Sequence, residues 1–99
     1  MTINYLIRTK GIMNNKELVK IFKAIANERR LDILRRVEKN KQLSVGVLSE
    51  QMDLSFRSVS KHLAVLTSAG LVEAKQMGLS RYYYISPDFP KQFSSFLKN

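Results

Sequence analysis

The residues best able to do chemistry in this chain are hydrogen-bond donors spaced along one short segment. Arg57 and Lys61 are four residues apart, so at about 100° per residue they share one outward face of a helix. Ser58 and His62 lie on one flank of that face, and Ser60 lies on the other. Arginine and lysine donate to guanine O6 and N7, while serine and histidine reach bases or phosphates. These side chains therefore suit contact with a nucleic acid.

The neighbourhood of these donors carries no acidic side chain. From residue 55 to residue 72 the sequence contains neither Asp nor Glu. A solvated helix face normally mixes both signs of charge, so this span favours a surface that faces phosphates. The whole chain points the same way, because 17 Lys and Arg against 8 Asp and Glu give 99 residues a formal charge of +9. A basic surface that only confers solubility is the alternative interpretation.

His62 is the only histidine, and the chain has no cysteine. Zinc sites, disulfides and His-paired catalysis need several such residues, so we expect no metal site, no cofactor and no disulfide. Two roles remain for His62: a contact to phosphate, or a hydrogen bond to nearby backbone. We favour the phosphate contact, because its flank borders the basic face. No paired-carboxylate or glycine-rich phosphate motif occurs, so the sequence also argues against an enzyme.

The donors lie in the last of four successive helices that the patterning predicts. The first helix begins near Lys16, and the later three begin at the capping residues Asn27, Ser44 and Ser55. The fourth ends at Gly70, which permits a left-handed stop. The positions expected to face inward have helical spacing. They are Leu18, Ile21, Phe22 and Ile25, then Leu31, Leu34 and Val37, then Val45, Leu48 and Met52, and finally Phe56, Val59, Leu63 and Leu66.

After Gly70 the apolar period becomes that of a strand. Residues 71–75 and 81–85 are predicted strands, joined by residues 76–80. Lys75 and Arg81 bracket the tip of this hairpin, where they can reach a nucleic-acid backbone or the adjacent minor groove. Three consecutive tyrosines in the second strand favour β-structure. We expect them to pack against the helices rather than to stack on bases.

The order helix, helix, short helix, helix, hairpin, helix describes a winged helix-turn-helix, mainly α with a small β-hairpin. Two segments also resemble the ArsR/SmtB family of transcriptional regulators: "KAIANERRLDILRRV" and "SVSKHLAVLTSAGLV". In the first, the positions in register with the family's opening motif are Ala26, Asn27, Arg30, Ile33 and Leu34. The resemblance runs from Ile21 to Ile85 and implies a regulator that binds double-stranded DNA.

The sequence departs from the family at positions that bear on mechanism. Asp53 stands where the turn commonly has glycine, and aspartate tolerates a left-handed backbone. Ser44 and Gly46 stand where thiolate metal sensors of the family carry cysteines. Other members place His and carboxylate ligands on the last helix, but here Asp88 is the only acid of that region and no histidine accompanies it. The resemblance therefore implies DNA binding without metal sensing.

Apolar residues are concentrated at both ends of the chain, beyond what a compact core needs. They are Ile3, Leu6 and Ile7 near the start, and Phe89, Phe93, Phe96 and Leu97 on a last helix that Ser86 and Pro87 are predicted to open. The family forms homodimers through its first and last helices, which would set two recognition helices about 34 Å apart. We therefore expect residues 1–14 to form an arm, helical or not, that contacts the partner. Residues 15–99 would form one winged helix-turn-helix domain with a C-terminal dimerisation helix.

The hypothesis from the sequence is a homodimeric, sequence-specific regulator of double-stranded DNA, expected to be a repressor. No apolar run is long enough to span a membrane, so the expected location is the cytoplasm. The alternative is a winged-helix module that binds a protein or RNA, because a fold does not fix a function. The sequence identifies neither an effector nor an operator.

Overall fold

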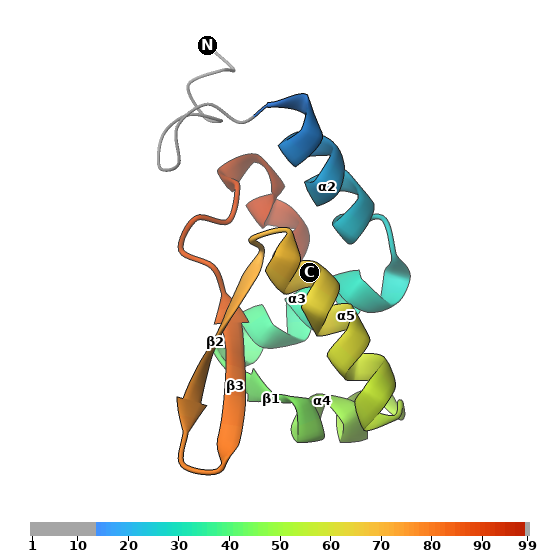
Figure 1. Ribbon diagram of the computed structural model, residues 1–99, viewed down its shortest axis with the longest axis vertical. Coiled ribbons are helices and arrows are strands. Elements are labelled where there is room, and N and C mark those ends of the chain that lie inside the picture. The colour runs from blue at the N-terminus through green and yellow to red at the C-terminus, as the bar shows by residue number, and fades with distance from the viewer. Residues whose placement is uncertain (1–13, 99) are drawn as a thin grey trace.

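The computed structural model describes residues 14–98, which form a bundle of helices beside a small antiparallel sheet (Figure 1). In chain order the elements are α2 (Asn15–Ile25), α3 (Glu28–Asn40), β1 (Leu43–Ser44), α4 (Val45–Met52), α5 (Phe56–Ser68), β2 (Val72–Met77), β3 (Ser80–Ile85) and the 3-10 helix η1 (Lys91–Leu97). The predicted fold class, a winged helix-turn-helix that is mainly α with a small β-hairpin, is confirmed. The predicted arm lies outside the described residues except for Asn14.

The helices begin where the capping residues predicted. The side chains of Asn27, Ser44 and Ser55 each accept a hydrogen bond from a backbone N–H three residues later. Asn14 does the same for α2 and completes a capping box with Glu17, whose carboxylate accepts from the Asn14 N–H at 2.9 Å. A side-chain N-cap contributes about 1 kcal/mol, so these four polar residues help to define the helix starts.

A tight turn joins α4 to α5 and sets the geometry of the helix-turn-helix. Asp53 ends α4 in the left-handed conformation, with φ of 54°. This is the conformation expected at the position where the family's turn commonly has glycine. The Leu54 N–H donates to the Ser49 carbonyl at 3.1 Å, and Ser55 then starts α5. The turn therefore works with aspartate in place of glycine, because aspartate is among the few residues that adopt this conformation readily.

The core gathers side chains from every helix and from the start of the hairpin. Among residues 14–98, the largest fully buried side chains are Ile33, Leu34 and Val37 of α3, Leu48 of α4, Val59, Leu63 and Leu66 of α5, and Leu71 and Val72 at the hairpin. Ile33 was not among the positions expected to face inward on α3, whereas Leu31, which was, is half-buried. Phe22 and Phe56 are the clear errors among the positions expected to face inward, whereas Phe96 was expected to belong to a dimer patch. Phe22, Phe56 and Phe96 are exposed by 51%, 61% and 50%.

The sheet has three strands in the order β1-β3-β2 rather than the two that the sequence predicts. In β1, Leu43 pairs with Tyr83 and Ser44 pairs with Tyr82. A two-residue strand has no period to detect, and only its partner defines it.

The hairpin strands are longer than predicted and the connecting loop is shorter. Met77 pairs with Ser80, so only Gly78 and Leu79 lie outside the ladder instead of residues 76–80. Gly78 has a φ of 64°, which a two-residue hairpin turn requires and glycine permits.

The predicted last α-helix, opened by Ser86 and Pro87, is absent from the described residues. Ser86 instead starts a turn, in which its carbonyl accepts from the Phe89 N–H at 3.0 Å. Pro90 explains the difference, because proline has no N–H for a helical hydrogen bond and disfavours the α conformation of the preceding residue. The shorter 3-10 helix η1 follows it, with Leu97 buried and Phe93 half-buried against the core.

Candidate nucleic-acid interface

The outward face of α5 carries the cations that the sequence singles out. Val59, Leu63 and Leu66 are completely buried, so α5 has one fixed orientation on the core. Arg57 and Lys61 consequently lie on its exposed side, one helical turn apart, while Ser58 and Ser60 are half-buried on the two flanks. The predicted face therefore exists as a surface, and the roles of its side chains remain predictions.

His62 is held by the guanidinium of Arg30. Arg30 Nη1 lies 3.3 Å from His62 Nδ1, and the half-buried imidazole faces α3. Because arginine can only donate, Nδ1 must accept, and the ring proton of the neutral imidazole is then on Nε2. The sequence left open a phosphate or a backbone partner. In the structure the partner is instead the side chain of Arg30, and the Nε2–H of His62 remains available as a donor.

Burial and the neighbouring arginines favour the neutral form of His62. Desolvation by burial, followed by the positive charges of Arg30 and Arg29, lowers the pKa of His62 below its ordinary value of 6.5. At neutral pH the side chain is thus a neutral hydrogen-bond donor. A neutral donor can bind phosphate or a base edge without the salt dependence of a full positive charge.

Arg30 also joins α5 to the end of α2. Its Nε donates to the Ala24 carbonyl at 2.7 Å, and its Nη2 donates to the Lys23 carbonyl at 3.2 Å. These carbonyls lack helical partners, and a cation at a helix C-terminus is favourable. Arg30 therefore fixes the position of α2 relative to α5. The sequence reasoning used Arg30 only as a motif position and missed this role.

Two lysines of α2 lie beside α5 and were also missed. Between the two helices is a cleft of about 330 Å³ with an apolar floor and a basic rim. Its lining consists of Lys20, Lys23, Ala24, Arg30, Ala64, Val65 and Ser68. Lys20 and Lys23 are visible in the sequence as part of a polar helix face, but only the packing of α2 against α5 brings them to this surface.

The hairpin presents its two cations on opposite faces. Lys75 pairs with Tyr82, whereas Arg81 pairs with Gln76, so the side chains of Lys75 and Arg81 project in opposite directions. Lys75 Nζ lies 5.7 Å from the centre of the Tyr84 ring. At the tip, Leu79 is fully exposed, a feature the sequence reasoning did not use. The two wing cations therefore cannot meet one phosphate together.

Of the three tyrosines, Tyr83 packs as expected, whereas the contacts of Tyr84 are with side chains of β2. Tyr83 contacts the core, and the Tyr84 hydroxyl donates to Glu73 Oε1 at 3.2 Å. That hydrogen bond is the main reason why the pKa of Tyr84 is raised. Among residues 14–98, no three His, Asp or Glu side chains come together as a potential metal site. Over the same residues no helix is long and apolar enough to cross a membrane.

A helix-turn-helix whose second helix presents an acid-free basic face, followed by a basic hairpin, defines a winged-helix DNA-binding protein. Residues 25–74 match the family model described as "Helix-turn-helix domain". The transcriptional activator HlyU of Vibrio cholerae is 42% identical over 73 residues, which cover 74% of this chain and 67% of HlyU. The arsenical resistance operon repressor of Escherichia coli is 33% identical over 72 residues, or 73% of this chain and 62% of the repressor.

Solved structures agree with the sequence comparisons. Reduced HlyU from Vibrio cholerae superimposes with a TM-score of 0.71 at 36% identity, covering 85% of this chain and 84% of that one. A homodimeric winged helix-turn-helix domain from Mycobacterium bovis, described as a possible ArsR-family regulator, gives a TM-score of 0.68 at 30% identity over 81% of this chain and 74% of that one. The chain belongs to the ArsR/SmtB family and is a DNA-binding transcriptional regulator, not an enzyme.

Proposed function

We propose that this regulator binds a specific double-stranded operator as a homodimer and represses transcription there. The observation that carries the proposal is the exposed, acid-free face of α5 around Arg57 and Lys61. We assign Arg57, Ser58 and Lys61 to bases, because their types match donors to base edges in the major groove. Phosphate contacts fall to the two flanks of α5, through Ser60 and the Nε2–H of His62. On the wing, Lys75 and Arg81 hold the backbone.

Homodimerisation is supported by an aromatic face shared by α2 and η1. Phe22 and Phe93 meet edge to face with ring centres 5.6 Å apart, and Phe93 stacks near Phe96 at 6.3 Å. Phe22, Phe96 and Val19 remain about half exposed, which is unusual for a monomer surface. The Mycobacterium bovis relative is a homodimer. We assign residues 1–14 to the same interface as an arm, with residues 15–99 as the DNA-binding domain.

Repression is proposed because a dimer seated on a promoter blocks polymerase without any further contact. The named relatives include both an activator and a repressor, so a reporter gene must decide whether this protein activates or represses transcription. We propose that the protein acts in the cytoplasm, where the DNA is, and without the cysteine metal site of its relatives, since Ser44 and Gly46 carry no thiol.

Selection of bound duplexes from a random DNA pool tests the proposal. A homodimer with two recognition helices should enrich a near-palindrome whose half-sites are about 10–10.5 base pairs apart, centre to centre. Loss of a reporter signal when that motif is placed in a promoter would support repression. Equal, weak binding of every duplex, together with tight binding to a protein or to RNA, would contradict the proposal and favour the alternative of a winged-helix interaction module.

A further inference from the structure

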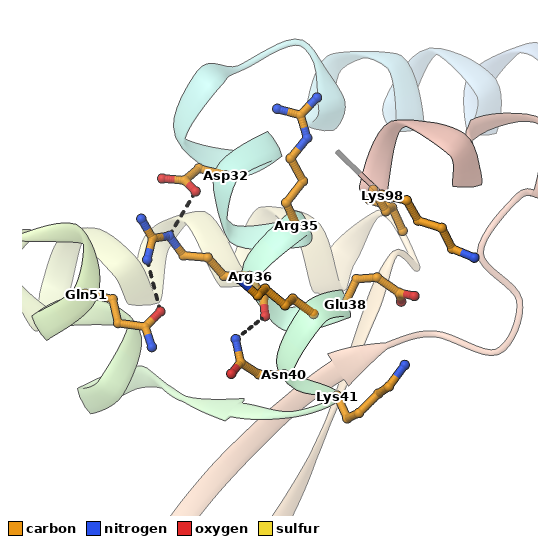
Figure 2. A pocket seen from close by; sticks show the side chains of 10 residues that line it. Asp32, Arg35, Arg36, Glu38, Asn40, Lys41, Gln51 and Lys98 are labelled. Carbon is orange, nitrogen blue, oxygen red and sulfur yellow. Dashed lines mark hydrogen bonds and ion pairs between the residues drawn. The ribbon is translucent and has the colours of Figure 1, made fainter.

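A second basic surface lies at the carboxyl end of α3, away from the residues assigned to DNA. It surrounds a hollow of about 720 Å³ between α3, α4 and the end of η1 (Figure 2). The lining residues are Asp32, Arg35, Arg36, Glu38, Lys39, Asn40, Lys41, Gln51, Leu97 and Lys98. A volume of this size suits a small organic ligand.

The charge of this hollow is strongly one-sided. Five of its lining side chains are cationic and two are carboxylates. Asp32 is already paired, with Arg36 Nε at 2.9 Å from its Oδ1. The carboxyl end of α3 contributes only about half a negative charge, which cannot balance the cations. The hollow is therefore positive beyond what the helix end requires.

Most of the donors in the hollow have no partner within residues 14–98. Arg35 uses Nε to donate to the Phe96 carbonyl at 2.8 Å, which anchors the guanidinium and leaves both Nη groups available. In the same part of the chain, Lys39, Lys41 and Lys98 make no hydrogen bond or ion pair. In Figure 2, the side chains of Lys41 and Lys98 extend toward the same side of the hollow as Glu38, whereas the guanidinium of Arg35 points away from Glu38. An anchored arginine fork is pre-oriented for a carboxylate or phosphate group.

We propose that this hollow binds a small organic anion that carries at least two carboxylate or phosphate groups. One anionic group would bind Arg35, and another would bind the lysines on the far side of Glu38. Two anionic groups are needed because the cations come from both α3 and the end of η1. Glu38 also lines the hollow, and its negative charge opposes the binding of any anion there.

The hollow is also placed to affect DNA binding, a consequence that depends on the proposed function. Arg36 Nη1 donates to Gln51 Oε1 at 3.0 Å, which ties α3 to the first helix of the helix-turn-helix. Arg35 ties α3 to η1, part of the aromatic dimer face. An anion bound to the Nη groups of Arg35 acts on the side chain that links α3 to η1, and so connects the hollow to the dimer face. The ligand would act as an effector of operator affinity.

Isothermal titration of the full chain with sodium pyrophosphate and with citrate, at fixed ionic strength, tests the binding site. Arg35→Gln and Lys41→Gln should each weaken binding by about tenfold or more, as loss of a charge-assisted contact predicts. Glu38→Gln should tighten binding by severalfold, because a repulsive charge is removed. Lys91→Gln, an exposed lysine outside the lining, is the matched control and should change binding less than about twofold. Equal losses in all three lysine and arginine variants, or no tightening in Glu38→Gln, would overturn the proposal.

Operator binding separates a small anion from DNA phosphate as the ligand. Without added anion, Arg35→Gln and Lys41→Gln should bind the selected operator with unchanged salt dependence. A smaller salt slope in these variants would show that DNA itself occupies the hollow and would overturn the small-anion proposal. Added pyrophosphate should shift the operator affinity of the unmodified chain more than that of Arg35→Gln. If the chain bound no operator at all, the proposed function would fail while the titration would still decide the anion site.

Discussion

Lys61 and His62 are adjacent in sequence, yet their surroundings give them different electrostatic characters. Lys61 is exposed on the outward face of α5 and keeps a full positive charge available to a partner. His62 is turned toward Arg30. The guanidinium of Arg30 cannot accept a hydrogen bond, and its positive charge repels a second one on the imidazole. Lys61 therefore offers a charge-assisted contact and His62 a neutral one. Replacing Lys61 should change the salt dependence of binding, whereas replacing His62 should not.

Replacement of Lys61 tests direct readout. Lys61→Ala should weaken binding to the selected operator by about 1–3 kcal/mol and relax the preference at one base position, because a donor to a base edge is lost. A fluorescence anisotropy titration against matched and mismatched duplexes measures both effects. Lys91→Ala serves as the control for loss of one charge. Unchanged affinity and preference in Lys61→Ala would remove Lys61 from the reading surface.

The lowered pKa of His62 makes folding stability depend on pH. Below pH 6.5 the unfolded chain takes up a proton at this residue more readily than the folded chain does. Stability contributed by the neutral His62 is therefore full above pH 6.5 and decreases as the pH falls through the lower pKa of the folded state. Urea unfolding of the unmodified chain and of His62→Gln across this range should differ in slope, with the variant losing less stability toward acid. Parallel curves would contradict a neutral, Arg30-bound His62.

Element packing, rather than residue type, decides which charges flank α5. The helix contacts both α2 and the hairpin strand β2, and the cleft between α2 and α5 is lined by two lysines of α2. Lys20 and Lys23 line the cleft between α2 and α5, whereas Arg81 is exposed near the tip of the wing. Charges of this kind contact phosphates without reading sequence.

The wing prediction concerns Arg81. Arg81→Ala should lower affinity by a similar factor for all duplexes and reduce the salt slope by about one, as expected for one lost phosphate contact. Titrations at several salt concentrations measure this slope. Because Lys75 projects from the opposite face of the hairpin, Lys75→Ala should change the slope independently of Arg81→Ala. An altered base preference in Arg81→Ala would contradict a purely backbone role.

The α2 prediction concerns the two lysines beside the cleft. The double variant Lys20→Gln and Lys23→Gln should reduce the salt slope by about two while leaving the selected motif unchanged. Lys16→Gln, on the same helix but outside the cleft, is the control and should leave the slope unchanged. If the double variant behaved like Lys16→Gln, the DNA backbone would not reach α2.

Besides the hollow at the end of α3, residues 14–98 form a basic surface around α5 and an aromatic one across α2 and η1. Arg30 connects them, since it holds both the end of α2 and His62 on α5. A change in how α2 packs at a dimer interface therefore reaches the recognition helix through one side chain. In the proposed dimer, this arrangement would couple association to operator binding.

Polar substitution of the aromatic face tests the dimer. Phe22→Ser with Phe96→Ser should shift the chain from dimer to monomer in sedimentation equilibrium, because these half-exposed rings supply apolar area for association. The isolated fold should survive, since neither side chain belongs to the buried core. Operator affinity should fall because the two half-sites are no longer bound together. A dimer of unchanged strength would place the interface elsewhere.

Local signals in the sequence predicted much of this fold. The caps at Asn27, Ser44 and Ser55, the left-handed Asp53 and the inward stripe of α5 depend on near neighbours, whose effects are encoded in residue type and spacing. The outward face with Arg57 and Lys61 followed from that stripe. The errors arose where local preference met a competing constraint, as at Pro90, or where too few residues carried a signal, as in β1.

By itself, the sequence determined the class of protein, the order of its helices and the cations available for a polyanion. Only the tertiary structure decided which of those cations share a surface. It set Lys20 and Lys23 beside α5, turned Lys75 and Arg81 to opposite faces, and grouped Arg35 with Lys98 around a separate hollow. The reason is physical: helix and strand periods fix directions within one element, whereas distances between elements follow from how their buried faces pack.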